Sequence, residues 1–112
     1  MKKIEAIIRS GRLDRTKEAL NRLRIQGMTV TQVMGCGNQK GRREMFRGTE
    51  IMVNLTPKVK IELVAPDDAV EAAVEAIIRE ARTGEVGDGK IFVYEVAEAI
   101  RIRTGERNDA AV

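Results

Sequence analysis

The clearest pattern of apolar and polar positions lies between residues 67 and 81. Apolar side chains recur there at spacings of three and four, which predicts an amphipathic helix with one buried face. Pro66 and the two aspartates after it are typical of a helix start. The apolar positions are Val70, Ala73, Val74, Ile77, Ile78 and Ala81. A second helix is predicted over residues 13–24, ending before Gly27.

Alternating apolar and polar positions predict four strands, over residues 3–8, 28–34, 59–63 and 90–96. The element order is therefore β-α-β followed by β-α-β. It predicts an α+β fold of the ferredoxin-like βαββαβ type: an antiparallel sheet with both helices on one face. The other face would need a cover, so we expect an oligomer. The 112 residues suit one domain, residues 1–112.

Residues 35–50 lose all periodicity and contain four glycines and four basic residues. A short apolar run, 51–55, follows and is interrupted by Pro57. So long a segment without a pattern is uncommon in a compact domain, and such loops are usually functional or disordered.

Composition narrows the possible functions. The net charge is +3, charges of both signs are mixed, and only three residues are aromatic, which disfavours a nucleic-acid binder. With no histidine and one cysteine, the usual zinc sites and histidine-based triads are excluded. No nucleophile–base arrangement is visible, so we expect no enzyme. Without a long apolar segment or a signal-peptide pattern, we expect a cytoplasmic protein.

A glycine-rich segment, Gly84–Lys90, has the spacing GxxxxGK. A P-loop would continue with Ser or Thr and a helix, whereas here Ile91 opens a strand, so the P-loop interpretation is rejected. Glycines still let backbone N–H groups approach an anion, and Lys90 supplies charge. The alternative is an ordinary helix-to-strand turn with a surface lysine.

Other candidates each have a plain alternative. Arg101 and Arg103 would share one side if extended and could bind phosphate, or form a solvated charge pair. Gln39 and Lys40, in the glycine-rich segment 35–41, could meet an anion or a metal-bound carboxylate, or belong to a flexible loop root.

Three further interpretations concern single positions. Cys36 is predicted to be a small buried apolar residue rather than a redox group. Lys58 alternates onto the opposite side of its strand from Val59, and its plain alternative is a solvated strand face. Asp67, Asp68 and Glu71 are interpreted as charges near a helix N-terminus rather than as catalytic acids.

Taken together, five segments resemble the PII nitrogen-regulatory proteins over nearly the whole chain. They are Met1–Arg9, Gln26–Val30, Pro57–Leu63, Thr83–Phe92 and Arg101–Glu106. The resemblance implies a homotrimer with nucleotide sites between subunits, where ATP and ADP compete and 2-oxoglutarate binds beside Mg-ATP. It implies that residues 37–55 form the target-binding T-loop, between the second and third strands, and that 97–112 form a C-terminal tail.

The resemblance also implies roles for individual residues. ATP and ADP would be bound by Thr29, Gly37, Gln39, Glu62, Val64, Gly87, Asp88, Gly89, Lys90, Arg101 and Arg103. Gln39 would ligate Mg²⁺. The 2-oxoglutarate residues would be Arg9, Gln39, Lys40, Gly41 and Lys58.

Several positions depart from the family pattern. Cys36 replaces the usual Phe, which could loosen the 2-oxoglutarate pocket, and Asn38 replaces an Arg that contacts phosphate. Ile51 replaces the Tyr of uridylylated relatives, and Phe46 has no hydroxyl, so we expect no such modification. Thr49 lies where some relatives have a phosphorylated Ser. Arg47 is retained, and in relatives that block ammonium channels it enters the pore.

The leading hypothesis is therefore a regulator acting on an ammonium transporter, a nitrogen-metabolic enzyme or a regulatory kinase, with a membrane involved only through a transporter. One alternative is a basic ferredoxin-like nucleic-acid-binding module, which needs stacking aromatics on an open sheet face. The other is a weak nucleotide hydrolase, for which the sequence offers no base to activate water.

Overall fold

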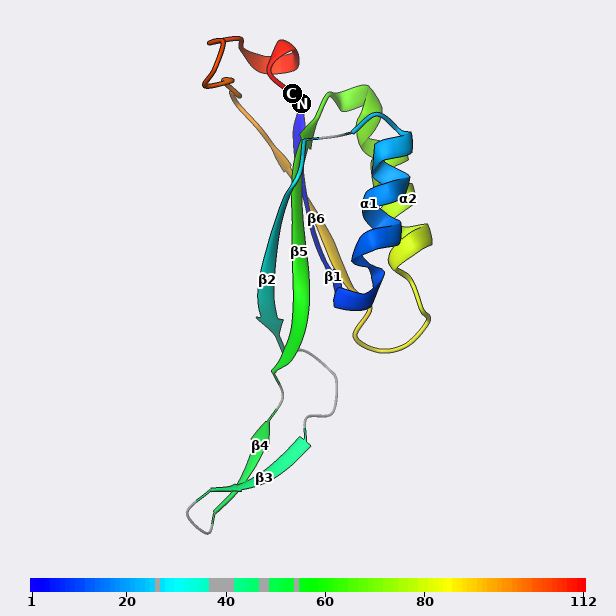
Figure 1. Ribbon diagram of the computed structural model, residues 1–112, viewed down its shortest axis with the longest axis vertical. Coiled ribbons are helices and arrows are strands. Elements are labelled where there is room, and N and C mark those ends of the chain that lie inside the picture. Colours follow the sequence, from blue (N-terminus) through cyan, green and yellow to red (C-terminus); the bar gives the residue numbers. More distant parts are fainter. Residues whose placement is uncertain (26, 37–41, 47–48, 54) are drawn as a thin grey trace.

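The computed structural model describes residues 1–25, 27–36, 42–46, 49–53 and 55–112. Its main feature is a four-stranded antiparallel sheet in the order β2-β5-β1-β6 (Figure 1). The strands are β1 Lys2–Arg9, β2 Thr29–Gly35, β5 Thr56–Ala65 and β6 Gly89–Glu95. Each lies within three residues of its predicted range, and the longest strand, β5, is central. The ferredoxin-like prediction is confirmed.

Two helices, α1 Leu13–Arg22 and α2 Asp67–Ala81, cover one face of this sheet (Figure 1). A short 3₁₀ turn, Ser10–Arg12, precedes α1, and the buried Thr16 hydroxyl donates to the Arg12 carbonyl at 2.7 Å. Asp67 lies in the first turn of α2, as predicted, and pairs with the Met1 amine at 2.7 Å.

The hydrophobic core follows from strict alternation along the two central strands. Ile4, Ala6 and Ile8 of β1 are almost fully buried. They lie opposite Leu63, Ile61 and Val59 of β5, and Leu20 and Ile77 pack on them from the helices. The period of two in the sequence therefore sends one set of side chains into the core and the other to the uncovered face.

Two short strands correct the prediction that residues 35–50 have no regular structure. Arg42–Phe46 forms β3 and Thr49–Val53 forms β4, and they pair antiparallel from Arg42↔Val53 to Phe46↔Thr49. Backbone pairing needs no apolar alternation, so a search for periodicity missed it. Pro57 also lies within β5, where it is opposite Met34 of β2. It lies beyond Lys58, the residue of β5 at which the pairing with β1 ends.

The face of the sheet away from the helices carries a network of half-buried charges. The Glu62 carboxylate on β5 forms ion pairs with the ammonium groups of Lys3 at 2.9 Å and Lys60 at 3.3 Å. Both lysines lower the pKa of the Glu62 carboxyl, Lys3 the more strongly. Phe92 and Tyr94 of β6 are exposed on this face, so two of the three aromatic residues lie on the open sheet face that the nucleic-acid-binding alternative needs. Acidic Glu5 lies directly opposite Phe92, which disfavours a phosphate backbone at that place.

Candidate functional site

The turn between α2 and β6 is organised around Asp88. Its carboxylate accepts hydrogen bonds from the Thr83 hydroxyl and from the backbone N–H groups of Thr83 and Gly84, both at 2.8 Å. Arg9 completes the set through an ion pair of 3.0 Å. These contacts, the Thr83 hydroxyl first, hold the pKa of Asp88 well below its usual range. Asp88 therefore stays ionised and fixes the turn, with its oxygens directed at the protein.

The glycines of this turn have conformations that other residues rarely adopt. Gly84, Gly87 and Gly89 have φ of +91°, +100° and +104°. A Cβ on Gly89 would lie 1.7 Å from the carbonyl oxygen of Ile7. Gly89 thus lets the start of β6 approach β1 directly.

For Lys58 the structure excludes the plain alternative, a solvated strand face. Only 5% of the residue is exposed, and its ammonium donates to the carbonyl of Gly87. It lies opposite Arg9 in the β1–β5 pairing, and Arg9 also donates to the Val86 carbonyl at 2.8 Å. Burial, with the positive charge of Arg9, lowers the pKa of Lys58. The sequence could not show this because the turn 83–88 that covers Lys58 is distant along the chain.

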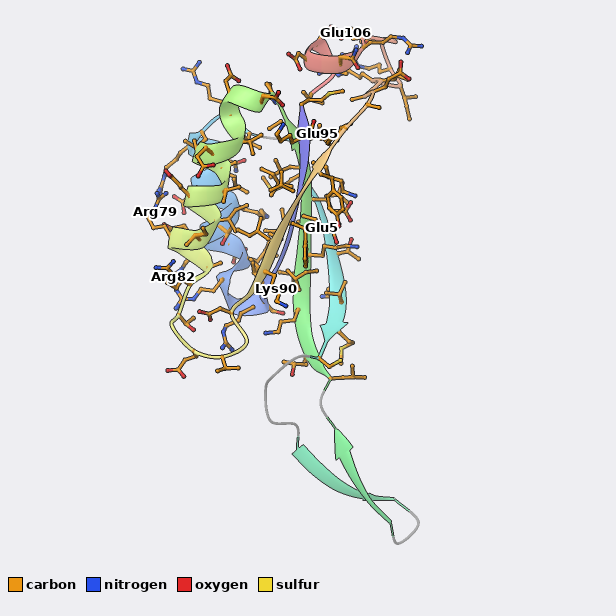
Figure 2. All side chains as sticks on the ribbon, turned by 180° about the vertical axis from the view of Figure 1, so that it is seen from behind. Glu5, Arg79, Arg82, Lys90, Glu95 and Glu106 are labelled. Carbon is orange, nitrogen blue, oxygen red and sulfur yellow. The ribbon has the colours of Figure 1, made fainter. Side chains whose placement is uncertain are left out.

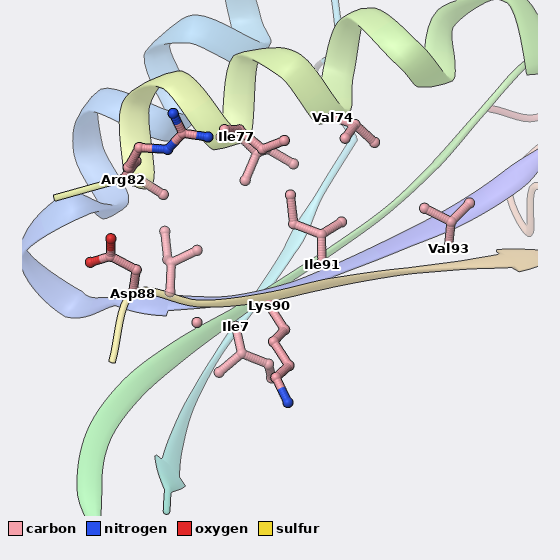
Figure 3. A pocket seen from close by; sticks show the side chains of 12 residues that line it. Ile7, Val74, Ile77, Arg82, Asp88, Lys90, Ile91 and Val93 are labelled. Carbon is pink, nitrogen blue, oxygen red and sulfur yellow. The ribbon is translucent and has the colours of Figure 1, made fainter. Parts of the chain in front are cut away.

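Lys58 and the turn residues 85–90 border a cavity of about 490 Å³ at one end of the sheet, the cationic cavity. Lys58 and Lys90 supply positive charge, and of the two acidic lining residues, Asp88 is already paired with Arg9. Figure 3 shows Lys90 and Ile7 pointing away from α2, toward the uncovered face of the sheet. Cys36 also lines the cavity and is exposed, so the prediction of a buried cysteine is wrong for the single chain. The cavity combines backbone turns and cations in the way that suits an anion.

A second group of predicted residues lies at the other end. Thr29 is opposite Glu62 across β2 and β5, and both border a cavity of about 1100 Å³ together with Val64 and Arg101. Gly89 pairs with Ile8 and Glu95 pairs with Lys2, so six residue steps of β6, or about 20 Å, separate the two ends. Figure 2 shows Lys90 toward one end of the sheet and Glu106 at the other.

The tail is not extended at Arg101 and Arg103. The prediction that these two side chains point to the same side assumed an extended segment, so it does not apply. It folds back instead: the Gly105 N–H donates to the Arg101 carbonyl at 2.8 Å, and Ile100 bridges to Arg107. Arg101 also pairs with Glu106 at 3.0 Å. Residues 108–110 then form a 3₁₀ turn, Asn108–Ala110.

Comparison with known proteins identifies the family. The sequence model described as "Nitrogen regulatory protein P-II" matches residues 1–106. The chain belongs to the P-II family. Nitrogen regulatory protein P-II 1 of Escherichia coli K12 is 60% identical over 112 residues, and the P-II proteins of Klebsiella oxytoca and Haemophilus influenzae are 59% and 56% identical. Each alignment covers 100% of both chains.

The P-II relatives are regulatory proteins by name, which agrees with the expectation that this chain is not an enzyme. No helix in the described part of the chain has the length and apolar character needed to cross a membrane. Several predicted P-II site residues lie outside the described residues: Gly37, Asn38, Gln39, Lys40, Gly41 and Arg47. The interpretations of Phe46, Thr49 and Ile51 concern side chains that are likewise outside the description.

Several residues of the site were missed from the sequence, and Ile7 and Thr83 are two of them. Ile7 lines the cationic cavity, and the Thr83 hydroxyl donates a hydrogen bond to the Asp88 carboxylate. Ile7 had a signal: it is an apolar residue on the otherwise polar side of β1, between Glu5 and Arg9. Thr83 had none, because a threonine just after a helix is ordinary.

Replacing Asp88 by asparagine should lower the stability of the fold at pH 7. It should also make that stability change less as the pH falls into the acid range. The folded pKa of Asp88 lies below the unfolded value of about 3.9, so its stabilisation is present above that value and is lost as pH falls through the folded pKa. Melting temperatures measured from pH 7 to pH 2 should therefore differ most near neutrality and converge in acid. Asp109→Asn, in the exposed tail, is the control; parallel wild-type and Asp88→Asn curves would contradict this role for the carboxylate.

Proposed function

We propose that this chain is a PII-type regulator that binds ATP and ADP between subunits and controls nitrogen-metabolism targets through residues 37–55. The observation that carries the proposal is the division of the predicted site into two halves at opposite ends of one chain. Lys58, Gly87 and Lys90 lie at one end, and Thr29 and Arg101 lie at the other. A nucleotide could touch both halves only where two copies meet, as in the homotrimer that the family resemblance implies.

The chemistry of the two halves suits the two parts of a nucleotide. Phosphates would be held by Lys90 and by the backbone of Gly87–Gly89, because glycines with positive φ leave their N–H groups open to a large anion. Asp88 would act indirectly by fixing this turn. The larger cavity would take the base beside Thr29, Glu62 and Val64, and Arg101 and Arg103 would reach the phosphates from there.

Binding of 2-oxoglutarate with Mg-ATP is the more demanding part of the proposal. Two adjacent cations, Arg9 and Lys58, suit a dicarboxylate, and Gln39 would ligate Mg²⁺, with Lys40 and Gly41 nearby. In the described structure, however, both cations already have partners, Asp88 and the Gly87 carbonyl. The ligand must therefore displace or share these contacts.

The target would be an ammonium transporter, a nitrogen-metabolic enzyme or a regulatory kinase in the cytoplasm. In a transporter complex, Arg47 would be the residue that enters the pore. The chain would act by binding rather than by catalysis, and Ile51 leaves no hydroxyl for uridylylation.

Isothermal titration calorimetry with ATP and with ADP tests the proposal. We expect both nucleotides to bind and to compete, and 2-oxoglutarate to bind only when Mg-ATP is present, because the bound metal links the two ligands. Sedimentation at several protein concentrations should show a trimer. The absence of nucleotide binding at millimolar concentration would overturn the proposal, whereas loss of the 2-oxoglutarate response alone would limit it to adenine nucleotides.

A further inference from the structure

Ile102 is an apolar side chain placed entirely in water. It is 100% exposed, at the tip of the tail turn and between the two arginines of the proposed site. The turn does not depend on the core for its shape: Arg101 N–H donates to the Glu106 carbonyl at 2.9 Å, and Thr104 donates to the Glu106 carboxylate at 2.7 Å. A preformed turn that projects one isoleucine has the form of an anchor residue, which loses little freedom on burial.

A matching recess lies beside β6. It is a crevice of about 410 Å³ between α2 and β6, with apolar walls that include Val74, Ile77 and Ile91 (Figure 3). Val93 and Ile78 at its edge are 46% and 39% exposed, so the recess is open to a partner. In Figure 3, Arg82 and Asp88 lie together at one end of it.

The crevice and the cationic cavity lie on opposite faces of the first residues of β6, and they adjoin around its free edge because β6 is the last strand of the sheet. Four residues border both spaces: Ile7, Asp88, Gly89 and Lys90. An apolar group seated in the crevice would therefore hold its sequence neighbours at the edge of β6, from which they can reach around to Lys90. The tail has the corresponding order of a cation, an apolar residue and a cation at Arg101, Ile102 and Arg103.

Within one chain these two features cannot meet, because the tail follows the end of β6 that lies about 20 Å from Gly89. We propose that Ile102 of one copy seats in the crevice between α2 and β6 of a second copy, and so positions Arg101 and Arg103 at that copy's cationic cavity. This inference rests on the proposed function, to which it adds a positioning residue that touches no phosphate.

The charges add a condition. Arg101 and Arg103 would approach Lys58 and Lys90, and four cations repel one another unless an anion lies between them. Polyphosphate should therefore strengthen the seating of Ile102. Arg101 can bind the polyphosphate while it stays paired with Glu106, because its guanidinium has five N–H donors and the Glu106 carboxylate accepts one of them at 3.0 Å.

The test is Ile102→Ala in the full chain, with Ile102→Val as the matched conservative variant. Because the side chain is fully exposed in one chain, the variant should fold, as circular dichroism would verify. We expect calorimetry to show roughly a tenfold or greater loss of ATP affinity for Ile102→Ala and little loss for Ile102→Val, since the value of a buried isoleucine is lost only in the first. Sedimentation should show weaker association, partly restored by ATP.

A double-mutant cycle locates the seat. Val93→Ala at the crevice edge should weaken ATP binding modestly, and its effect should shrink in the Ile102→Ala background because the two side chains touch. If the losses of ATP affinity caused by Val93→Ala and Ile102→Ala multiply in the double variant, the two substitutions act independently, and Ile102 does not bind in this crevice.

The outcomes separate this inference from the proposed function. If Ile102→Ala binds ATP like wild type while Lys90→Ala does not, the anchor is refuted and the nucleotide site stands. If wild type binds no nucleotide, the proposed function fails. The anchor then depends on sedimentation: Ile102→Asp should weaken association, and an unchanged oligomeric state would refute it.

Discussion

Gly89→Ala is expected to be among the most destabilising single substitutions in this chain. The new Cβ would lie 1.7 Å from the Ile7 carbonyl oxygen, and that atom belongs to the backbone of a central strand. The φ of +104° is strained for alanine as well. We expect a loss of roughly 3 kcal/mol or more in the free energy of unfolding, measured by urea denaturation, because β1 and β6 must separate at this point.

Gly84→Ala is the matched control. Its φ is also positive, at +91°, but a Cβ there would meet nothing within 4 Å. It should cost only about 1–2 kcal/mol, the price of the left-handed conformation alone. The difference between the two variants isolates the close approach to Ile7, and equal losses would show that backbone conformation is the whole effect.

The second large effect is on ligand binding. Lys90→Ala should weaken ATP binding by about 10- to 100-fold, because a charged hydrogen bond to phosphate is worth about 1.5–3 kcal/mol. Lys90 is exposed at the start of β6 and borders the cationic cavity, so its removal should leave the fold intact. Calorimetry and a parallel melting curve would separate the two properties.

Lys17→Ala provides the comparison, since Lys17 is an exposed cation on α1, on the covered side of the sheet. It should bind ATP like wild type, apart from a small change from the lost overall charge. Normal binding by Lys90→Ala would show that the phosphates are held elsewhere and that the site assignment is wrong.

The fold could be predicted because local patterns in this chain agree with the tertiary structure. Alternation in β1 separates the buried Ile4, Ala6 and Ile8 from the opposite face, and the 3.6-residue period of α2 places Ile77 against them. Pro66 and the aspartates after it marked the start of α2 within one residue. In each case, the residues that decide the structure are neighbours in sequence.

What could not be predicted depends on contacts between distant segments. Lys58 looked solvated because the turn that buries it lies about thirty residues later, as its bond to Gly87 shows. The turned tail at Arg101 depends on Glu106 and Thr104, which a simple extended-strand assumption ignored. The β3–β4 pairing depends on backbone hydrogen bonds, which leave little trace in side-chain patterning. The candidate site was therefore recognised by residue type and family resemblance rather than by geometry.

The placement of the two half-sites at opposite ends of the sheet has a consequence for cells that make mixed chains. In the proposed ring of three, a copy carrying Lys90→Ala harms only the site to which it lends its cationic cavity. A copy carrying Arg101→Ala harms only the site at its other end. A copy with both changes would disable two of the three sites, so a modest amount of it could silence a population of normal chains. The effect of variant chains on normal chains in such a mixture would thus depend on whether the substitutions alter one end of the chain or both, and not only on how many there are.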